Sequence, residues 1–194
     1  MMKICFIFCM SWITEINEYD GSDELKKIYQ EIKTKRGKLS NVMTVHSLNP
    51  GSMKCHMDLY VHLMFGSSPL SRADREFIAV LVSFFNNCGY CVQHHLEALR
   101  HYWKEEDVIN EMMCDIDAVD LDPRLDNLMR YVKKLTFAPS DVSEKDINGL
   151  REQGFTDRGI LDIGLIVGYF NFVNRIVLGL GVEATSDEIG GYRY

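Results

Sequence analysis

The stretch that decides the fold covers residues 70–95 and reads LSRADREFIAVLVSFFNNCGYCVQHH. Its first half is apolar at helical spacing and starts behind Ser71 and Asp74, which are spaced as in a capping box. Two asparagines at residues 86–87 interrupt the apolar pattern, and a second helix is expected to begin around Cys88. The stretch therefore predicts two consecutive helices, which we expect to fold back on each other as an antiparallel hairpin.

Helical periodicity also dominates the rest of the chain, and no run of four to eight residues alternates as a half-buried strand would. Capping residues, prolines and glycines mark where helices start and stop. They predict helices at about residues 23–36, 50–65, 72–85, 88–100, 104–113, 123–135, 144–153 and 157–178. The sequence thus predicts an all-α fold. Its last helix is apolar nearly all round, so we expect it to be buried or to form one face of a subunit interface.

The size and composition of the chain fit one folded domain. Its 194 residues, 46% of them hydrophobic, are enough to bury one substantial core. We expect a single domain over residues 11–194, preceded by residues 1–10 as an N-terminal extension or as the product of a misassigned start, with Met10 as the true first residue. The apolar run at the start is too short for a membrane span and no small-residue cleavage site follows it, so neither a span nor a signal peptide is expected.

Charge and cysteine usage exclude several classes of partner. A net charge of -7 gives no basic face for nucleic acid or for an anionic membrane, so we expect neither partner. Six cysteines, of which one pair has C-x-x-C spacing, do not form the disulfide framework of a small secreted protein. They fit a reducing compartment, and a cytoplasmic location is expected.

The C-x-x-C pair and a following histidine form the main candidate site. Cys88, Cys91 and His95 are three and four residues apart, so on one helix they share a face. The first turn of a helix offers free N–H groups that stabilise a thiolate. A helix N-terminus contributes about 0.3 to 2 kcal/mol, whereas lowering a thiol pKa from about 8.5 to about 6.5 requires about 2.7 kcal/mol. A second group is therefore needed, and His95 can act as the base or as the stabilising cation.

Glu76 is the candidate third member of this site. In an antiparallel hairpin it faces His95, whose tautomer it can fix, and the same geometry places Ser83 beside Cys91. An ion pair between Glu76 and Arg175 is the structural alternative. Asn171, Asn174 and Arg175 interrupt the apolar last helix, and we interpret them as a helix–helix or subunit contact.

Two other interpretations of the cysteine pair stay open. C-x-x-C with a nearby histidine can belong to a zinc site, although structural zinc usually draws on ligands from separated segments. Two buried and inert cysteines on an amphipathic helix are the second possibility. No phosphate loop, dinucleotide fingerprint or Ser-His-Asp arrangement is visible in the sequence, so no bound cofactor is expected.

The spacing of Glu76, Cys88, Cys91 and His95 resembles the alkylhydroperoxidase D-like branch of the carboxymuconolactone decarboxylase superfamily. Residues 70–76, 87–91 and 170–175 are similar to its uncharacterised peroxidase-related subgroup, and the resemblance extends over about residues 11–192. It implies an all-α alkylhydroperoxidase D-like fold with the C-x-x-C pair at a helix N-terminus. It also implies a homo-oligomer, either a dimer, a trimer or a hexamer.

The resemblance further implies which residue does what. Cys91 would be the peroxidatic nucleophile, Cys88 the resolving thiol, and His95 with Glu76 the proton relay. Tyr90 stands where the founding peroxidases have a histidine, so the proton path or the substrate can differ, and Tyr90 and Ser83 are expected to be accessory.

The predicted function is that of a thiol-dependent peroxidase with antioxidant activity of the alkyl hydroperoxide reductase type. Its substrate would be a hydroperoxide, and an external dithiol, either a reductant protein or a lipoyl group, would restore the cysteines. A general disulfide oxidoreductase and a non-enzymatic, redox-sensing helical oligomer remain the alternatives. Lactone decarboxylation is less expected, because the decarboxylases of the superfamily lack the cysteine pair.

Overall fold

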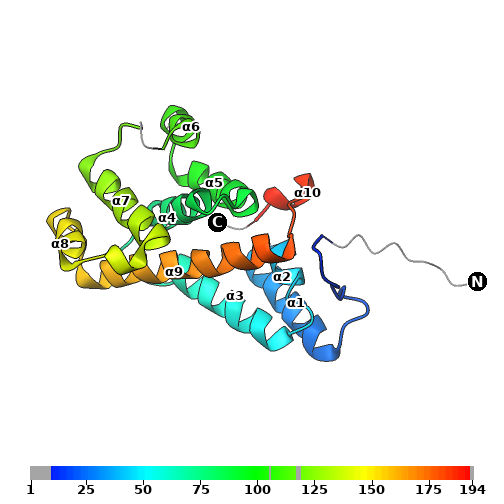
Figure 1. The fold of residues 1–194 in the computed structure, drawn as a ribbon. Helices are drawn as coiled ribbons and strands as arrows, with labels where there is room; N and C mark the ends of the chain where they lie inside the picture. Colours follow the sequence, from blue (N-terminus) through cyan, green and yellow to red (C-terminus); the bar gives the residue numbers. More distant parts are fainter. Residues whose placement is uncertain (1–9, 105, 117–118, 193–194) are drawn as a thin grey trace, which may run out of the picture. The chain divides into compact units, whose positions relative to one another are not determined.

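The computed structural model describes residues 10–104, 106–116 and 119–192, which form helices joined by loops, with no strand among them (Figure 1). The predicted all-α class is confirmed. In chain order the helices are α1 (Asp23–Arg36), α2 (Asn41–Thr44), α3 (Pro50–Phe65), α4 (Arg72–Phe85), α5 (Gly89–Tyr102), α6 (Glu106–Cys114), α7 (Pro123–Phe137), the 3-10 turn η1 (Pro139–Asp141), α8 (Glu144–Glu152), α9 (Asp157–Leu180) and α10 (Ser186–Ile189). The predicted extension at residues 1–10 lies, Met10 apart, outside the described residues.

Local signals explain where the helices begin and end. The Ser22 hydroxyl accepts a hydrogen bond from the Leu25 N–H at 3.2 Å and starts α1, and Gly37 ends it in the left-handed conformation at φ 81°. Ser71 and Asp74 form a reciprocal capping box at the start of α4, with N···O distances of 3.0 and 2.9 Å. The short elements α2, η1 and α10 were not predicted, because a single turn is too short to show a hydrophobic period.

The helices group into two compact units. The first holds the described residues up to Asp58 together with those from Ile176 onward, and the second holds residues 59–175. Helices α3 and α9 each contribute residues to both units. The single domain predicted over residues 11–194 stays a prediction.

The first unit is built around α1. Its apolar face is buried, and the Tyr29 hydroxyl donates to the Ile16 carbonyl at 2.7 Å. The C-terminal segment is tied to this unit, because the Lys38 ammonium donates to the Gly190 carbonyl at 2.8 Å and the Asn41 N–H to the Glu188 carboxylate at 2.7 Å.

A pair of neighbouring histidines, of which His56 is buried and His46 half-buried, also belongs to the first unit. His46 Nδ1 donates to the Val42 carbonyl at 2.9 Å, so its Nε2 is left as an acceptor, and His56 Nδ1 lies 3.3 Å from that Nε2. Burial, with a smaller contribution from the charge of His46, lowers the pKa of His56 to about 3. Burial also lowers the pKa of His46. Both rings are therefore neutral at neutral pH.

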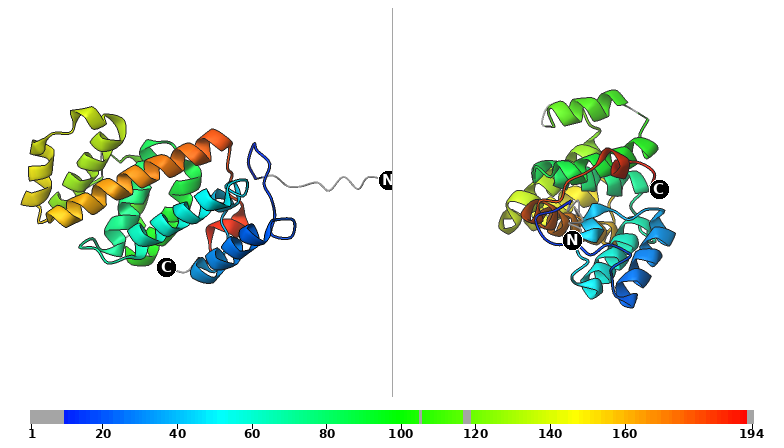
Figure 2. Two further views of the ribbon diagram at one scale, coloured as in Figure 1. Left: turned by 90° about the horizontal axis from the view of Figure 1, so that it is seen from below. Right: turned by 90° about the vertical axis from the view of Figure 1, so that its right-hand side faces the viewer.

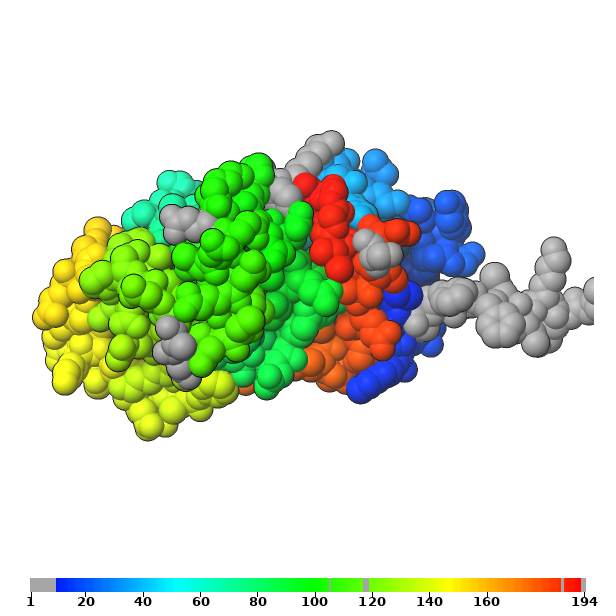
Figure 3. All heavy atoms as spheres, turned by 90° about the horizontal axis from the view of Figure 1, so that it is seen from above, coloured from blue at the N-terminus to red at the C-terminus, as the bar shows by residue number. Residues whose placement is uncertain are grey.

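The second unit has α4 at its centre. Residues 77–82 of α4 are fully buried, α5 packs beside α4, and α7 packs on α4 from another side (Figures 1 and 2). The antiparallel hairpin predicted for α4 and α5 is thus present. From above, the side chains of α5, α6 and α7, coloured green to yellow-green, form a continuous surface of this unit (Figure 3).

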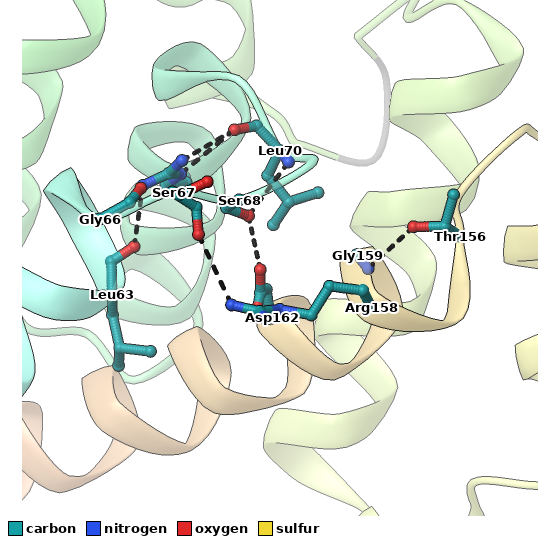
Figure 4. A network of polar contacts seen from close by, with 10 residues as sticks. Leu63, Gly66, Ser67, Ser68, Leu70, Thr156, Arg158, Gly159 and Asp162 are labelled. Atoms are coloured by element: carbon teal, nitrogen blue, oxygen red, sulfur yellow. Dashed lines mark hydrogen bonds and ion pairs between the residues drawn. The ribbon is translucent and has the colours of Figure 1, made fainter.

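A polar network fixes the loop between α3 and α4 to the start of α9 (Figure 4). The Ser68 hydroxyl donates to one oxygen of Asp162 at 2.6 Å, and Arg158 Nε donates to the other at 2.9 Å. The buried guanidinium of Arg75 donates to three carbonyls, that of Leu63 near the end of α3 and those of Gly66 and Leu70 in the loop. These bonds hold the first turn of α4 in place, and Glu76 lies at the end of that turn.

Helix α9 is long and apolar enough to cross a membrane by length and composition, and it alone passes this test among the described residues. A core helix of a soluble protein passes it as well, and 44% of the most apolar window of α9 is buried inside the protein. Leu161, Leu165 and Phe172 on this helix are exposed. The predicted absence of a membrane partner stays a prediction.

Candidate active site

The cysteine pair lies at the start of α5. Cys88 is the N-cap residue, and its carbonyl accepts the Val92 N–H at 3.0 Å. Its own N–H donates to the Ser83 carbonyl at 2.8 Å, which joins the end of α4 to the start of α5. Asn87 turns the chain between them at φ 54°. Cys91 therefore lies in the first turn of α5, and both cysteines are buried and form no disulfide.

Glu76 and His95 meet across the hairpin, as the sequence predicts. His95 Nδ1 lies 2.7 Å from Glu76 Oε2, and the Glu76 side chain is only 1% exposed. An ionised carboxylate only accepts hydrogen bonds, so we assign the neutral ring's proton to Nδ1. The Nε2 nitrogen of His95 is then the one able to take up a proton.

Arg72 provides the positive charge beside Glu76. Its Nη2 lies 2.6 Å from Glu76 Oε1, and its guanidinium stacks on the ring of Phe65 at 3.9 Å. Arg72 also donates to the Met64 carbonyl at the end of α3. The i, i+4 spacing of Arg72 and Glu76 in the sequence could have identified this pair.

Arg175, the partner considered for Glu76 from the sequence, binds elsewhere. Its Nη1 donates to the backbone carbonyl of Asn171 at 2.7 Å and to the side-chain oxygen of the same residue at 2.9 Å. The alternative ion pair between Glu76 and Arg175 is therefore wrong. Arg72 satisfies Glu76 from one turn away on the same helix.

Electrostatics favour a thiolate at Cys88. The hydrogen bond with the Cys91 side chain lowers the pKa of Cys88 most, and burial opposes this effect. The Cys91 backbone N–H, the Asn174 side chain and the charge of His94 lower the pKa of Cys88 further. This combination of donors at a helix N-terminus is the arrangement that activates thiols.

Aromatic rings surround the His95 imidazole. The ring of Phe170 meets it edge-on at 4.6 Å between centroids, and the Tyr60 ring lies 6.4 Å away. Tyr169 in turn packs against Tyr60 at 6.0 Å. These rings keep water from much of the imidazole, which strengthens its hydrogen bond to Glu76.

The two residues predicted to be accessory lie next to other members of the site. The Tyr90 ring packs on His94 at 4.4 Å between centroids, and His94 Nδ1 donates to the Tyr90 carbonyl at 2.9 Å. Besides its backbone bond to Cys88, Ser83 accepts a hydrogen bond from Asn174 at its hydroxyl. Their accessory roles stay predictions.

The contacts that Asn174 and Asn86 make in this region were not predicted from the sequence. Asn174 is fully buried on α9, where Asn86 Nδ2 donates to its oxygen at 3.0 Å and its own Nδ2 donates to Ser83 Oγ at 3.2 Å. The polar interruption of the apolar last helix was the available signal, and its interpretation as a helix–helix contact fits Asn174. Nothing in the sequence indicated that the contact would reach Cys88.

The zinc alternative requires several ligands that lie close together. Among the described residues, no group of three or more His, Cys, Asp or Glu side chains lies close enough together to hold a metal ion.

Fold and site together define a class of protein: an all-α protein with a cysteine pair at a helix N-terminus, and with a buried glutamate paired to a histidine on that same helix. The sequence matches the model of the Carboxymuconolactone decarboxylase family over residues 52–134. The chain belongs to the alkylhydroperoxidase D-like branch of this superfamily.

Several relatives support this assignment. An uncharacterized peroxidase-related protein from Silicibacter sp. TM1040 is 32% identical, with 89% of this chain and 90% of that chain covered and a TM-score of 0.77. An uncharacterized peroxidase-related protein with an alkylhydroperoxidase AhpD core, from Ralstonia eutropha JMP134, is 27% identical, with 93% and 95% covered and a TM-score of 0.83. The uncharacterized protein YdfG of Bacillus subtilis is 23% identical over 148 residues, which are 76% of this chain and 99% of YdfG.

Proposed function

We propose that this protein is a thiol-dependent peroxidase that reduces hydroperoxides with the Cys88–Cys91 pair. One observation carries the proposal: the two cysteines begin α5, and His95, one helical turn after Cys91, has its Nδ1 2.7 Å from the buried carboxylate of Glu76. The peroxidase-related relatives at 32% and 27% identity support an antioxidant enzyme of this kind.

The first half of the reaction consumes the peroxide. His95 Nε2 takes the proton of Cys91, one helical turn away, while Glu76 holds the imidazole through Nδ1. The Cys91 thiolate attacks one peroxide oxygen, the O–O bond breaks, and the leaving alkoxide takes a proton from the imidazolium. Cys91 becomes a sulfenic acid and the hydroperoxide becomes an alcohol.

The second half forms a disulfide between the cysteines. The Cys88 thiolate attacks the Cys91 sulfur, the sulfur–oxygen bond breaks, and hydroxide leaves as water after protonation. The donors that lower the pKa of Cys88 keep this thiolate available. An external dithiol, a reductant protein or a lipoyl group, then reduces the disulfide. We further propose a cytoplasmic homo-oligomer that needs no bound cofactor.

Peroxide consumption tests this proposal. Purified protein is mixed with hydrogen peroxide or cumene hydroperoxide and with dithiothreitol or dihydrolipoamide as the reductant. Catalytic turnover that Cys91→Ser abolishes is expected. Cys114→Ser is the matched control, because Cys114 is an exposed free thiol on α6 and should not affect the rate. A rate equal to the uncatalysed reaction with every combination would refute the peroxidase proposal.

A general disulfide oxidoreductase is the second candidate function. The observation that favours it is the lowered pKa of Cys88, because a stabilised N-terminal thiol of a C-x-x-C pair is suited to exchange with other disulfides. Reduction of insulin disulfides by the reduced protein separates the two candidates. Insulin reduction without peroxide turnover would favour the oxidoreductase.

A further inference from the structure

Three asparagine side chains form a chain of hydrogen bonds that ends at the cysteine pair. Asn171 and Asn174 lie one turn apart on α9, and Asn86 is the C-cap of α4. Asn86 Nδ2 donates to Asn171 Oδ1 at 3.1 Å and to Asn174 Oδ1 at 3.0 Å. Asn174 Nδ2 faces Ser83 Oγ at 3.2 Å, in a place where no part of its side chain is exposed.

The orientation of these amides follows from neighbouring groups that can act only as hydrogen-bond donors or only as acceptors. Asn171 Nδ2 lies 3.0 Å from the Val167 carbonyl, which can only accept. Asn171 Oδ1 lies 2.9 Å from the guanidinium of Arg175, which can only donate. With Asn171 fixed from both ends, Asn86 must present its NH₂ group to Asn171 and Asn174. Asn174 must then present its own NH₂ group to Ser83 and Cys88.

The NH₂ group of Asn174 has two hydrogens and two neighbours. One hydrogen serves the Ser83 hydroxyl, and the Asn174 side chain is also a hydrogen-bond partner of Cys88. A buried sulfur that receives an amide N–H and the Cys91 backbone N–H is stabilised as an anion. Cys91 is the more accessible of the two cysteines, because it is 3% exposed while Cys88 is 0% exposed.

We propose that Asn174 is a positioning residue that holds Cys88 as the leaving thiolate when an external dithiol reduces the Cys88–Cys91 disulfide. A thiolate of the dithiol attacks the more accessible Cys91 sulfur and forms a mixed disulfide. The bond between the two cysteines breaks, and its electron pair goes to the Cys88 sulfur, which receives the N–H groups of Asn174 and Cys91. The buried end of the disulfide thereby becomes the better leaving group.

The second thiol of the dithiol completes the reduction. It attacks the reductant's own sulfur in the mixed disulfide and expels the Cys91 sulfur, which takes the proton that this thiol loses. The dithiol leaves as its cyclic disulfide, Cys91 is a thiol, Cys88 is a thiolate, and one proton from the dithiol has gone to solvent. This inference rests on the proposed function, because it concerns the reductive half of that reaction.

The test measures the thiol pair itself and needs no peroxide. Asn174→Leu removes the donor at similar volume. The reduction potential of the pair is measured in dithiothreitol redox buffers, and the pH titration of the thiolate is followed by its ultraviolet absorbance. A hydrogen bond to a charged group contributes enough to change an equilibrium by about tenfold or more. We expect the reduced form to be disfavoured about tenfold, which lowers the potential by about 30 mV for this two-electron couple.

Two further variants keep the test decisive. Asn86→Ala frees the Asn174 amide to rotate without touching Cys88, so it should shift the potential and the titration in the same direction by a smaller amount. If Asn174→Leu does not fold, Asn86→Ala takes its place in the test. Asn171→Ala is the matched control, since it removes an amide of the same network that leaves the bond between Asn86 and Asn174 in place, and its shift should be the smallest.

The outcomes distinguish this inference from the proposed function. An unchanged potential and thiolate titration in Asn174→Leu, or in Asn86→Ala where the first variant does not fold, would overturn the role of Asn174. A shift in Asn171→Ala as large as that in Asn174→Leu would also overturn it, because the effect would then be general loosening of the network. If the wild-type protein shows no peroxide turnover but the shift occurs, the peroxidase proposal fails while the assignment of Cys88 as the stabilised thiolate stands.

Discussion

Replacing Glu76 by glutamine tests whether the buried carboxylate orients His95. The carboxylate accepts from Arg72 at 2.6 Å and from His95 at 2.7 Å, and glutamine keeps its shape but places an NH₂ group against one of these donors. A hydrogen bond to a charged group is worth about 1.5 to 3 kcal/mol, which corresponds to about 10- to 100-fold in rate. We expect that loss of peroxide turnover in Glu76→Gln, and about 10²- to 10⁴-fold in His95→Ala, which removes the base.

The same substitution should also destabilise the fold, so a control for stability is needed. Asp74→Asn provides it, because Asp74 is a buried carboxylate on the same helix that accepts from Arg124 at 2.7 and 3.0 Å. Both variants should lower the free energy of unfolding by about 1 to 3 kcal/mol, since each replaces a charge-assisted hydrogen bond. Only Glu76→Gln should lower turnover beyond the loss of folded protein.

The assays are steady-state peroxide consumption with dithiothreitol and urea unfolding at neutral pH. Because Glu76 and His95 act as a unit, the double variant should be little slower than His95→Ala alone. Losses that multiply would show that Glu76 acts independently of His95. An equal rate in Glu76→Gln and Asp74→Asn would reduce Glu76 to a structural ion-pair partner of Arg72.

Three other predictions concern the cysteines, the histidine pair and a helix end. Cys88→Ser should still form a sulfenic acid with peroxide while Cys91→Ser should not, as mass spectrometry of the trapped products would show, and the reverse result would exchange their roles. His56 has a pKa lowered to about 3 in the folded protein, so between about pH 6.5 and pH 3 this residue is protonated in the unfolded chain but not in the folded one. The stability that depends on His56 is therefore complete above about pH 6.5 and declines as the pH falls. Urea unfolding should give a loss of about 2 kcal/mol at pH 5 in the wild type, and His56→Phe should remove most of this dependence. Gly37→Ala should lower the free energy of unfolding by about 1 to 2 kcal/mol because Gly37 has φ 81°, and an unchanged thermal midpoint would contradict this reasoning.

Much of the hairpin and half of the site could be predicted because the signals are local. The capping box at Ser71 and Asp74 starts α4 wherever this helix lies in the fold, and the two asparagines before Cys88 end it. Spacing within α5 puts Cys91 and His95 on one face for the same reason. The position of Glu76 needed one further assumption, the antiparallel hairpin, and a short connection between two apolar helices makes that arrangement the expected one.

The sequence alone determined the longer helices, the place of Cys91 in the first turn of α5 and, given the hairpin, the pairing of Glu76 with His95. Each of these features depends on residues fewer than 20 positions apart. Only the tertiary structure decided which side chains from distant parts of the sequence surround Cys88. Asn174 is 91 residues away from Ser83 and 88 residues away from Asn86, and it is hydrogen-bonded to both. No helical period links such distant residues, because their meeting depends on how α9 packs against α4. A buried amide must find partners, but only packing determines which ones it finds.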